Sequence, residues 1–88
     1  MDVSEFHIGL EFWCSGNLYR CTDVGSRVVV AIRIDEVTIA THSDGVTTER
    51  IMGRQEAEQM GWFNGPPYGV LEMVFDEYDL EGCLLEPE

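Results

Sequence analysis

The fold is decided by the stretch at residues 6–22, which is FHIGLEFWCSGNLYRCT. Apolar side chains occupy every second position from residue 6 to residue 14, which is the period of a β-strand with one buried face. We expect that face to carry Phe6, Ile8, Leu10, Phe12 and Cys14. Trp13 then falls on the opposite face. Ser15-Gly16-Asn17 favours a tight turn, because Gly and Asn tolerate positive φ, and residues 18–22 return as a second strand.

A third strand is predicted at residues 27–34, after a turn at residues 23–26. The segment is rich in β-branched residues, which favour strands. We expect Arg33 to point outward and four side chains to point inward: Val28, Val30, Ile32 and Ile34. The phase changes at Asp35-Glu36, because the next apolar residues, Val37 and Ile39, occupy odd positions. A bulge, bend or strand break is therefore predicted there.

The middle of the chain combines a turn signal with a helix signal. Ser43-Asp44-Gly45 predicts a turn, and residues 46–52 after it fit either a returning strand or the first turns of a helix. Residues 53–60 are mostly good helix formers, and Gly61 suits the C′ position at which many helices end. We therefore predict one short helix before residue 61.

The C-terminal third begins with a rigid aromatic loop at residues 62–69, WFNGPPYG. Its two consecutive prolines remove two backbone donors, so neither a helix nor a central strand accommodates them. A closing strand is expected at residues 70–75, apolar on both faces apart from Glu72. Residues 76–88 are acidic, and we expect them to be mostly peripheral.

These elements predict a single domain over residues 1–88, with flexible termini at residues 1–5 and 84–88. The fold class is mainly β (α+β), with four to six short strands and one short helix around residues 53–60. A small, partly open barrel of the SH3-like type fits this set of elements better than a sandwich, which needs more residues.

Three segments carry a resemblance to known sequences. Residues 20–27 are RCTDVGSR and continue into VAIR at residues 30–33, residues 62–68 are WFNGPPY, and residues 74–79 are VFDEYD. On these segments the chain resembles a family of small uncharacterised bacterial proteins, and the resemblance covers most of the chain. The resemblance implies a free-standing bacterial protein and brings no functional residues with it.

The charge of the chain limits its partners. Seventeen Asp and Glu residues against five arginines give a formal net charge of -12. Such a field repels phosphate backbones and attracts basic proteins, cationic peptides or metal ions, so a nucleic-acid partner is not expected. The simpler alternative is that the charge keeps a small domain soluble, as a monomer or weak homo-oligomer.

The location of the protein is predicted from two segments. The longest apolar run, residues 28–32, is much shorter than a membrane span, and the acidic residues 1–5 do not resemble a secretory signal. We therefore expect a cytoplasmic protein with no membrane partner.

The cysteines and histidines form the first candidate metal site. They are Cys14, Cys21, Cys83, His7 and His42. Their number suffices for tetrahedral zinc, but zinc ribbons and fingers use cysteine pairs two to four residues apart, which this chain lacks. An odd number of cysteines also indicates a reducing compartment. Buried free thiols explain these cysteines better than zinc ligands do.

The acidic segment at residues 76–82 is the second candidate metal site. It does not match an EF-hand loop, because Tyr78 and Leu80 occupy positions that need oxygen ligands. We therefore predict no cofactor and no bound metal, and keep a small metal-binding protein only as the alternative function. Neither histidine lies in a recognisable motif with a nucleophile, so we do not expect an enzyme.

Aromatic and acidic residues form the strongest candidate site. Trp13 and the 62–69 loop, beside carboxylates, would make a groove suited to cationic or proline-containing peptides. The alternative is that these rings form a second layer of core under the loop, or stack on Arg20 and Arg33. The sequence thus favours a non-enzymatic module that binds a protein or peptide partner, with a predicted contact set of Trp13, Trp62, Phe63, Tyr68, Asp76, Glu77 and Asp79.

Overall fold

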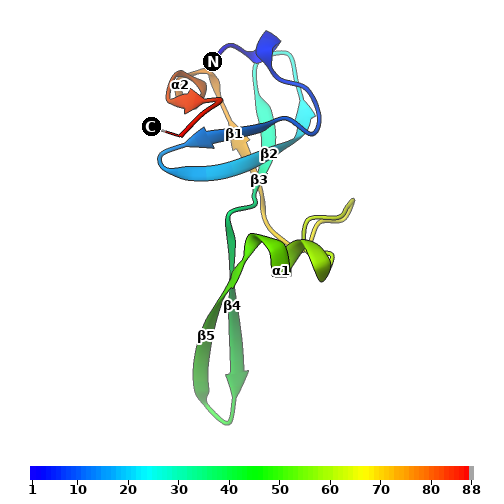
Figure 1. Cartoon of the computed structure of the whole chain (residues 1–88), viewed down its shortest axis with the longest axis vertical. Coiled ribbons are helices and arrows are strands. Elements are labelled where there is room, and N and C mark those ends of the chain that lie inside the picture. Colours follow the sequence, from blue (N-terminus) through cyan, green and yellow to red (C-terminus); the bar gives the residue numbers. More distant parts are fainter. Residues whose placement is uncertain (88) are drawn as a thin grey trace.

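The computed structural model describes residues 1–87 and is mainly β, as the sequence predicts (Figure 1). Within these residues, five strands form one sheet, and two form a separate hairpin. The sheet has the order β6-β3-β2-β1-β7 and consists of β1 (Glu11–Cys14), β2 (Asn17–Val24), β3 (Val29–Arg33), β6 (Glu72–Phe75) and β7 (Cys83–Leu84). The hairpin consists of β4 (Glu36–Ser43) and β5 (Val46–Gly53). Helices are η1 (Val3–Glu5, 3-10), α1 (Arg54–Gln59) and α2 (Glu77–Glu81).

The hairpin between β1 and β2 confirms the predicted turn. Cys14 pairs with Asn17, so the turn contains only Ser15 and Gly16. Both have positive φ, 51° and 80°. This is the conformation that matches the twist of the flanking strands in a two-residue hairpin. Asn17 belongs to β2 and not to the turn.

The first strand is shorter than predicted, since it begins at Glu11 and not at residue 6. A turn interrupts the alternating pattern: Leu10 N donates a hydrogen bond to His7 O at 3.0 Å, and Gly9 has a φ of 96°. Ile8 is consequently 67% exposed, although Phe6 still reaches the core. The prediction that Ile8 points inward, on one face with Phe6, Leu10, Phe12 and Cys14, is therefore wrong. Gly9 permits a backbone conformation that strands exclude, and this conformation interrupts the strand.

The main sheet buries side chains on both faces. One cluster contains Val29 and Ala31 from β3, whereas the other contains Ile32 and Ile34. The expectation that Val28 and Val30 point inward is wrong, since both are only half-buried. The prediction assumed a single buried face. A strand that is covered on both faces shows a nearly continuous apolar run instead of alternation.

The first cluster is built around Phe12, which is fully buried. Its ring packs edge to face against Phe6 and Phe75, with centroid distances of 5.0 and 5.5 Å, and is stacked on Tyr19 at 5.7 Å. Leu80 of α2 and Cys83 of β7 complete this cluster. The expectation that residues 76–88 are mostly peripheral is therefore wrong for these two side chains, because α2 covers one face of the sheet.

The second cluster joins the opposite face to the segment between β3 and β6. It contains Leu18, Ile32 and Ile34 together with Met52 from the end of β5, Ala57 of α1, Val37 and Phe63. Arg20 reinforces this junction, because it donates hydrogen bonds to Glu58 of α1 at 2.6 Å and to Glu11 at 3.3 Å. Helix α1 is therefore attached to the sheet by apolar packing and by ion pairs.

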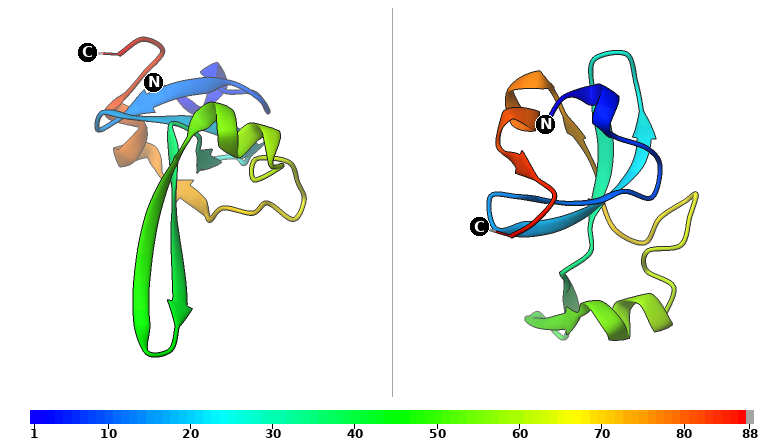
Figure 2. Two further views of the ribbon diagram at one scale, coloured as in Figure 1. Left: turned by 60° about the horizontal axis from the view of Figure 1, so that its bottom comes forward. Right: turned by 45° about the horizontal axis from the view of Figure 1, so that its top comes forward.

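The β4–β5 hairpin, called the arm below, extends away from the sheet (Figures 1 and 2). Residues 46–52, which the sequence left open, form a strand. The arm turns at Asp44 and Gly45, both with positive φ, and the predicted strand break lies between Arg33 and Glu36. The predicted helix is α1, and Gly61, with a φ of 83°, lies just beyond its C-cap Met60 as expected.

The main sheet is open. Strands β6 and β7 lie at its two ends, and within residues 1–87 each has only one neighbour. The described residues form seven strands, five in the sheet and two in the arm, against the predicted four to six. The additional strand is β7, which lies in the acidic C-terminal segment. Helix α2 was not predicted. The SH3-like type remains a prediction.

Candidate functional site

A groove of about 290 Å³ is the candidate site. It lies where β6 meets the base of the arm and the end of the aromatic loop, and is called the β6 groove below. Its lining comes from β3, β4, the loop and β6: Arg33, Glu36, Val37, Thr38, Trp62, Gly69, Val70, Leu71 and Met73. Most of these side chains are apolar, which is typical of pockets that bind ligands or peptides.

Strand β6 forms one edge of the sheet beside this groove. It pairs with β3 in the register Ala31 to Met73, and within the described residues no strand pairs with its other side. Two apolar side chains on or next to β6 face solvent: Leu71 is 78% exposed and Val74 is 64% exposed. A free edge with exposed apolar neighbours is a template for pairing with an extended chain.

The aromatic loop is held in place by two close approaches to glycine. A Cβ atom at Gly69 would lie 2.9 Å from Cε3 of Trp62, and one at Gly65 would lie 2.7 Å from the ring of Tyr68. Gly69 N also donates a hydrogen bond to Trp62 O at 3.0 Å. Both rings are half-buried and pack against the second cluster. Trp62 therefore lines the β6 groove with part of its indole, while its contacts with Gly69 and the second cluster hold the ring in position.

Phe63 is buried, whereas its neighbour Trp62 is half-buried. It is 4% exposed and belongs to the second cluster itself. Its side chain is therefore not available to a partner, and we leave it out of the candidate surface. The sequence pattern offered no means of separating Phe63 from Trp62, because both lie in an irregular loop without a period.

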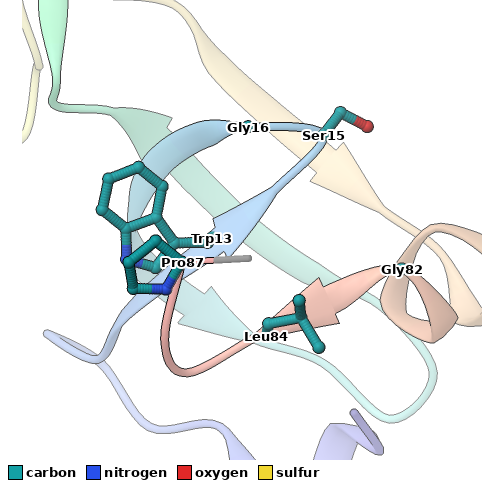
Figure 3. A pocket seen from close by; sticks show the side chains of 6 residues that line it. All are labelled: Trp13, Ser15, Gly16, Gly82, Leu84 and Pro87. Carbon is teal, nitrogen blue, oxygen red and sulfur yellow. The ribbon is translucent and has the colours of Figure 1, made fainter.

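Trp13 lines a second, smaller pocket of about 180 Å³, together with the C-terminal segment (Figure 3). The other lining residues are Ser15, Gly16, Gly82, Leu84 and Pro87. Trp13 and Trp62 thus line separate pockets, although both also pack against the second cluster. The sequence left two alternatives for these rings, an exposed aromatic surface and a second core layer. Each indole has one part that lines a pocket and another part that packs against the second cluster, so both alternatives apply in part.

The predicted acidic contact residues lie in and before α2, directly after β6. Asp76 caps the helix: its side chain accepts hydrogen bonds from Tyr78 N and Asp79 N, both at 3.0 Å. The bond from Asp79 N is the main reason why the pKa of Asp76 is below its usual value. Asp79 accepts one from Asp76 N in return at 3.1 Å. Glu77 is exposed in the first turn of the helix.

The single arginine in the groove lining is neutralised by carboxylates. Arg33 Nε lies 2.6 Å from Asp35 Oδ1, and Arg33 Nη2 lies 3.1 Å from Glu36 Oε1. Burial by itself would raise the pKa of Asp35, but the hydrogen bonds and charge of Arg33 outweigh it, so this pKa is lowered. Because two carboxylates pair with one guanidinium, this end of the groove carries a net negative charge.

The candidate metal ligands do not form a metal site, although Cys14 and Cys83 are paired across β1 and β7. Within residues 1–87, no group of three or more His, Cys, Asp or Glu side chains is arranged to hold a metal ion. Cys21 and Cys83 are buried free thiols, and Cys14 is half-buried. His7 and His42 are both exposed, and His42 Nδ1 lies 2.9 Å from the Thr47 hydroxyl across the arm.

The predicted contact set contains only Trp62 of the groove lining, and the apolar residues that it missed are Val37, Val70, Leu71 and Met73. A signal was present for the last three, because residues 70–75 are apolar on both faces apart from Glu72. At the edge of a sheet, such a strand leaves apolar side chains in solvent. The sequence does not show which strand becomes an edge, since this depends on the order of all five.

In comparisons with known proteins, no family model, no curated protein and no solved structure matches the chain. The described residues also include no helix of the length and apolar character that crossing a membrane requires. The resemblance to a bacterial family therefore stays a prediction, and the function has to be proposed from the groove.

Proposed function

We propose that this chain is a non-enzymatic acidic interaction module, which binds an extended segment of a protein or peptide partner along β6. The observation that carries the proposal is the free edge of β6 beside a groove with apolar and charged lining residues, with Leu71 and Val74 in solvent. An added strand obtains affinity from main-chain hydrogen bonds and specificity from pockets for alternate side chains. The β6 groove supplies such a pocket beside Trp62.

The charge around β6 selects a basic segment. Glu72 lies within the strand, Asp76 and Glu77 follow it directly, and Arg33 in the groove is paired with two carboxylates. The chain as a whole carries a net charge of -12. Complementary charge accelerates the encounter with a partner and disfavours wrong ones. The same charge opposes pairing of this edge with a second copy of the chain.

Binding is tested with a fluorescein-labelled peptide of alternating arginine and valine, followed by fluorescence anisotropy. We expect binding that weakens as salt rises from low to physiological ionic strength, because the screening length shortens. Leu71→Asp should weaken it about tenfold or more, as expected for a residue at the centre of an interface. Ile8→Asp is the matched control, since Ile8 is 67% exposed and lies outside the groove lining.

Two further peptides distinguish strand addition from simple charge attraction. A peptide with proline at alternate positions keeps the charge but cannot pair along the strand, and it should not bind. A peptide with glutamate in place of arginine should not bind either. If the proline peptide binds as well as the first one, or if Leu71→Asp and Ile8→Asp behave alike, the β6 edge is not the site.

A further inference from the structure

Two of the three cysteines lie directly opposite each other in the sheet. Cys14 is the last residue of β1, Cys83 is the first of β7, and the two are cross-strand partners in an antiparallel pair. Opposed residues in such a pair have Cα atoms about 4.5 to 5.5 Å apart and project from the same face. That separation lies within the range of about 4.4 to 6.8 Å found in disulfides.

The sulfur atoms of these residues approach the same acceptor. Cys83 Sγ lies 3.4 Å and Cys14 Sγ lies 4.0 Å from the carbonyl oxygen of Asp79 in α2. Both thiols are free. The side chains therefore converge at one place beneath α2, and joining them requires rotation about the side-chain bonds without a change of strand register.

We propose that Cys14 and Cys83 are a thiol pair that is oxidised to a disulfide by a small-molecule disulfide of the glutathione class. The Cys14 thiolate attacks one sulfur of the oxidant and releases one thiolate. This forms a mixed disulfide on Cys14. The Cys83 thiolate then attacks the Cys14 sulfur and releases the second thiolate of the oxidant. The protein loses two electrons and two protons, and the oxidant becomes two thiols.

The surroundings of the two sulfurs assign this order of attack. Cys14 is half-buried and accessible to a small oxidant, whereas Cys83 is 1% exposed. Burial, followed by the hydrogen bond with Cys14, raises the pKa of the Cys83 thiol to about 12. A thiolate is the attacking form in both steps. An oxidant in solution reaches Cys14 and not Cys83, so Cys14 reacts first. Cys83 then attacks the adjacent Cys14 sulfur within the molecule, where proximity compensates for its small thiolate fraction.

A disulfide at this position would fasten the end of the chain to the sheet. Strand β7 consists of two residues and, in the part of the chain that the structure describes, pairs with β1 alone, so few hydrogen bonds hold it. The neighbouring pair in the ladder is Trp13 and Leu84, which both line the smaller pocket. Oxidation would therefore fix the two walls of this pocket relative to each other. This inference does not depend on the proposed function of the β6 groove.

The test incubates the full chain with oxidised glutathione at pH 8, alkylates the remaining thiols and determines the links by peptide mass spectrometry. The wild-type chain should lose two hydrogens and give a Cys14–Cys83 link, with Cys21 alkylated after unfolding. Cys83→Ser should stop at a glutathione adduct on Cys14. Cys14→Ser should give neither product, and Cys21→Ser is the matched control that should behave as wild type.

Three results would overturn the proposal. The wild-type chain could accumulate the glutathione adduct on Cys14 without forming the internal link, or it could stay fully reduced. A disulfide that includes Cys21 would be the third. Because Cys83 is buried, circular dichroism accompanies each variant, and Cys83→Ala replaces a serine variant that does not fold. The wild-type peptide map decides the link by itself, so the proposal remains testable if neither variant folds.

Discussion

The main sheet and the arm are built from the same local structure but differ in what covers them. Both contain a two-residue turn with two positive φ values, Ser15-Gly16 in the sheet and Asp44-Gly45 in the arm. In the sheet, each strand contributes buried side chains. In the arm, only Val37 and Met52 at its base are buried, and residues 38–51 are exposed or half-buried.

This difference shows that strand formation and burial have separate causes. Turn residues and β-branched side chains favour the pairing of β4 with β5, which extends over eight register positions. A core needs a second layer. Helix α2 covers a face of the sheet, whereas α1 packs on the base of the arm and leaves its outer part uncovered. An isolated two-stranded hairpin is marginally stable in water, so the stability of the arm depends on its attachment at Val37 and Met52.

The largest expected effect comes from exchanging one side chain in each region for alanine. Phe12→Ala removes the centre of the first cluster and should lower the free energy of unfolding by about 3–5 kcal/mol. Ile51→Ala on the arm, where Ile51 is 64% exposed, should change it by less than about 0.5 kcal/mol. Urea unfolding followed by circular dichroism measures both. Similar losses in the two variants would show that the arm is part of the cooperative core.

A matched pair of turn variants gives the next largest effect. Gly16 and Gly45 have φ values of 80° and 78°, and a Cβ at either position would meet nothing within 4 Å. Alanine at either site costs about 1–2 kcal/mol of backbone strain. Gly16→Ala should lower the global free energy of unfolding by that amount. Gly45→Ala should instead accelerate amide exchange in β4 and β5 and leave global unfolding nearly unchanged.

The two turn variants test whether the arm and the main sheet unfold as one unit. Equal losses of global stability for Gly16→Ala and Gly45→Ala would mean that the arm unfolds together with the sheet. Unchanged amide exchange in the arm of Gly45→Ala would mean that contacts other than its turn hold it.

The smallest effect concerns the ion pairs between α1 and the sheet, and it depends on pH. The hydrogen bond from Arg20 is the main reason why the pKa of Glu58 lies below its ordinary 4.5. A carboxylate with a depressed pKa stabilises the folded state above its unfolded pKa, and this contribution is lost as pH falls through the folded value. Acidification below about pH 4.5 should therefore loosen α1, seen as faster exchange of its amides.

Glu58→Gln isolates this contribution from those of the other carboxylates. In this variant, the pH dependence of exchange in α1 should be weaker than in the wild type, while Arg54 still binds Glu11 at 2.9 Å. Exchange in the outer half of the arm should be the same in both proteins. An unchanged pH dependence in α1 would mean that the apolar contacts of Ala57 hold the helix without help from Arg20 and Glu58.

The local elements of this fold were predictable where a residue type restricts the backbone. Ser15-Gly16 and Asp44-Gly45 are turns, Gly61 follows the end of a helix, and the change of phase at Asp35-Glu36 marks the end of a strand. Each of these signals involves a few neighbouring residues. They require no knowledge of what packs on either side.

The features that depend on distant contacts were not predictable. Val29 and Ala31 are buried because α2 and the N-terminal segment cover a face that the pattern assigned to solvent. Leu80 and Cys83 lie in an acidic segment, yet they pack under Phe12 and Phe75. In the candidate site, the sequence identified Trp62 but not Leu71, since only the strand order shows that β6 is an edge.

The position of the arm within the chain has a consequence for the order of folding. Strands β1, β2 and β3 follow one another, so they pair through short loops, whereas β6 pairs with β3 only after residues 34–71 have been bridged. The arm removes about half of that distance, because it pairs Glu36 with Gly53. Each halving of a loop lowers the entropic cost of closing it by about 0.6 kcal/mol. The arm contributes few side chains to the core. It nevertheless lowers the entropic cost of pairing the edge strand β6 with β3.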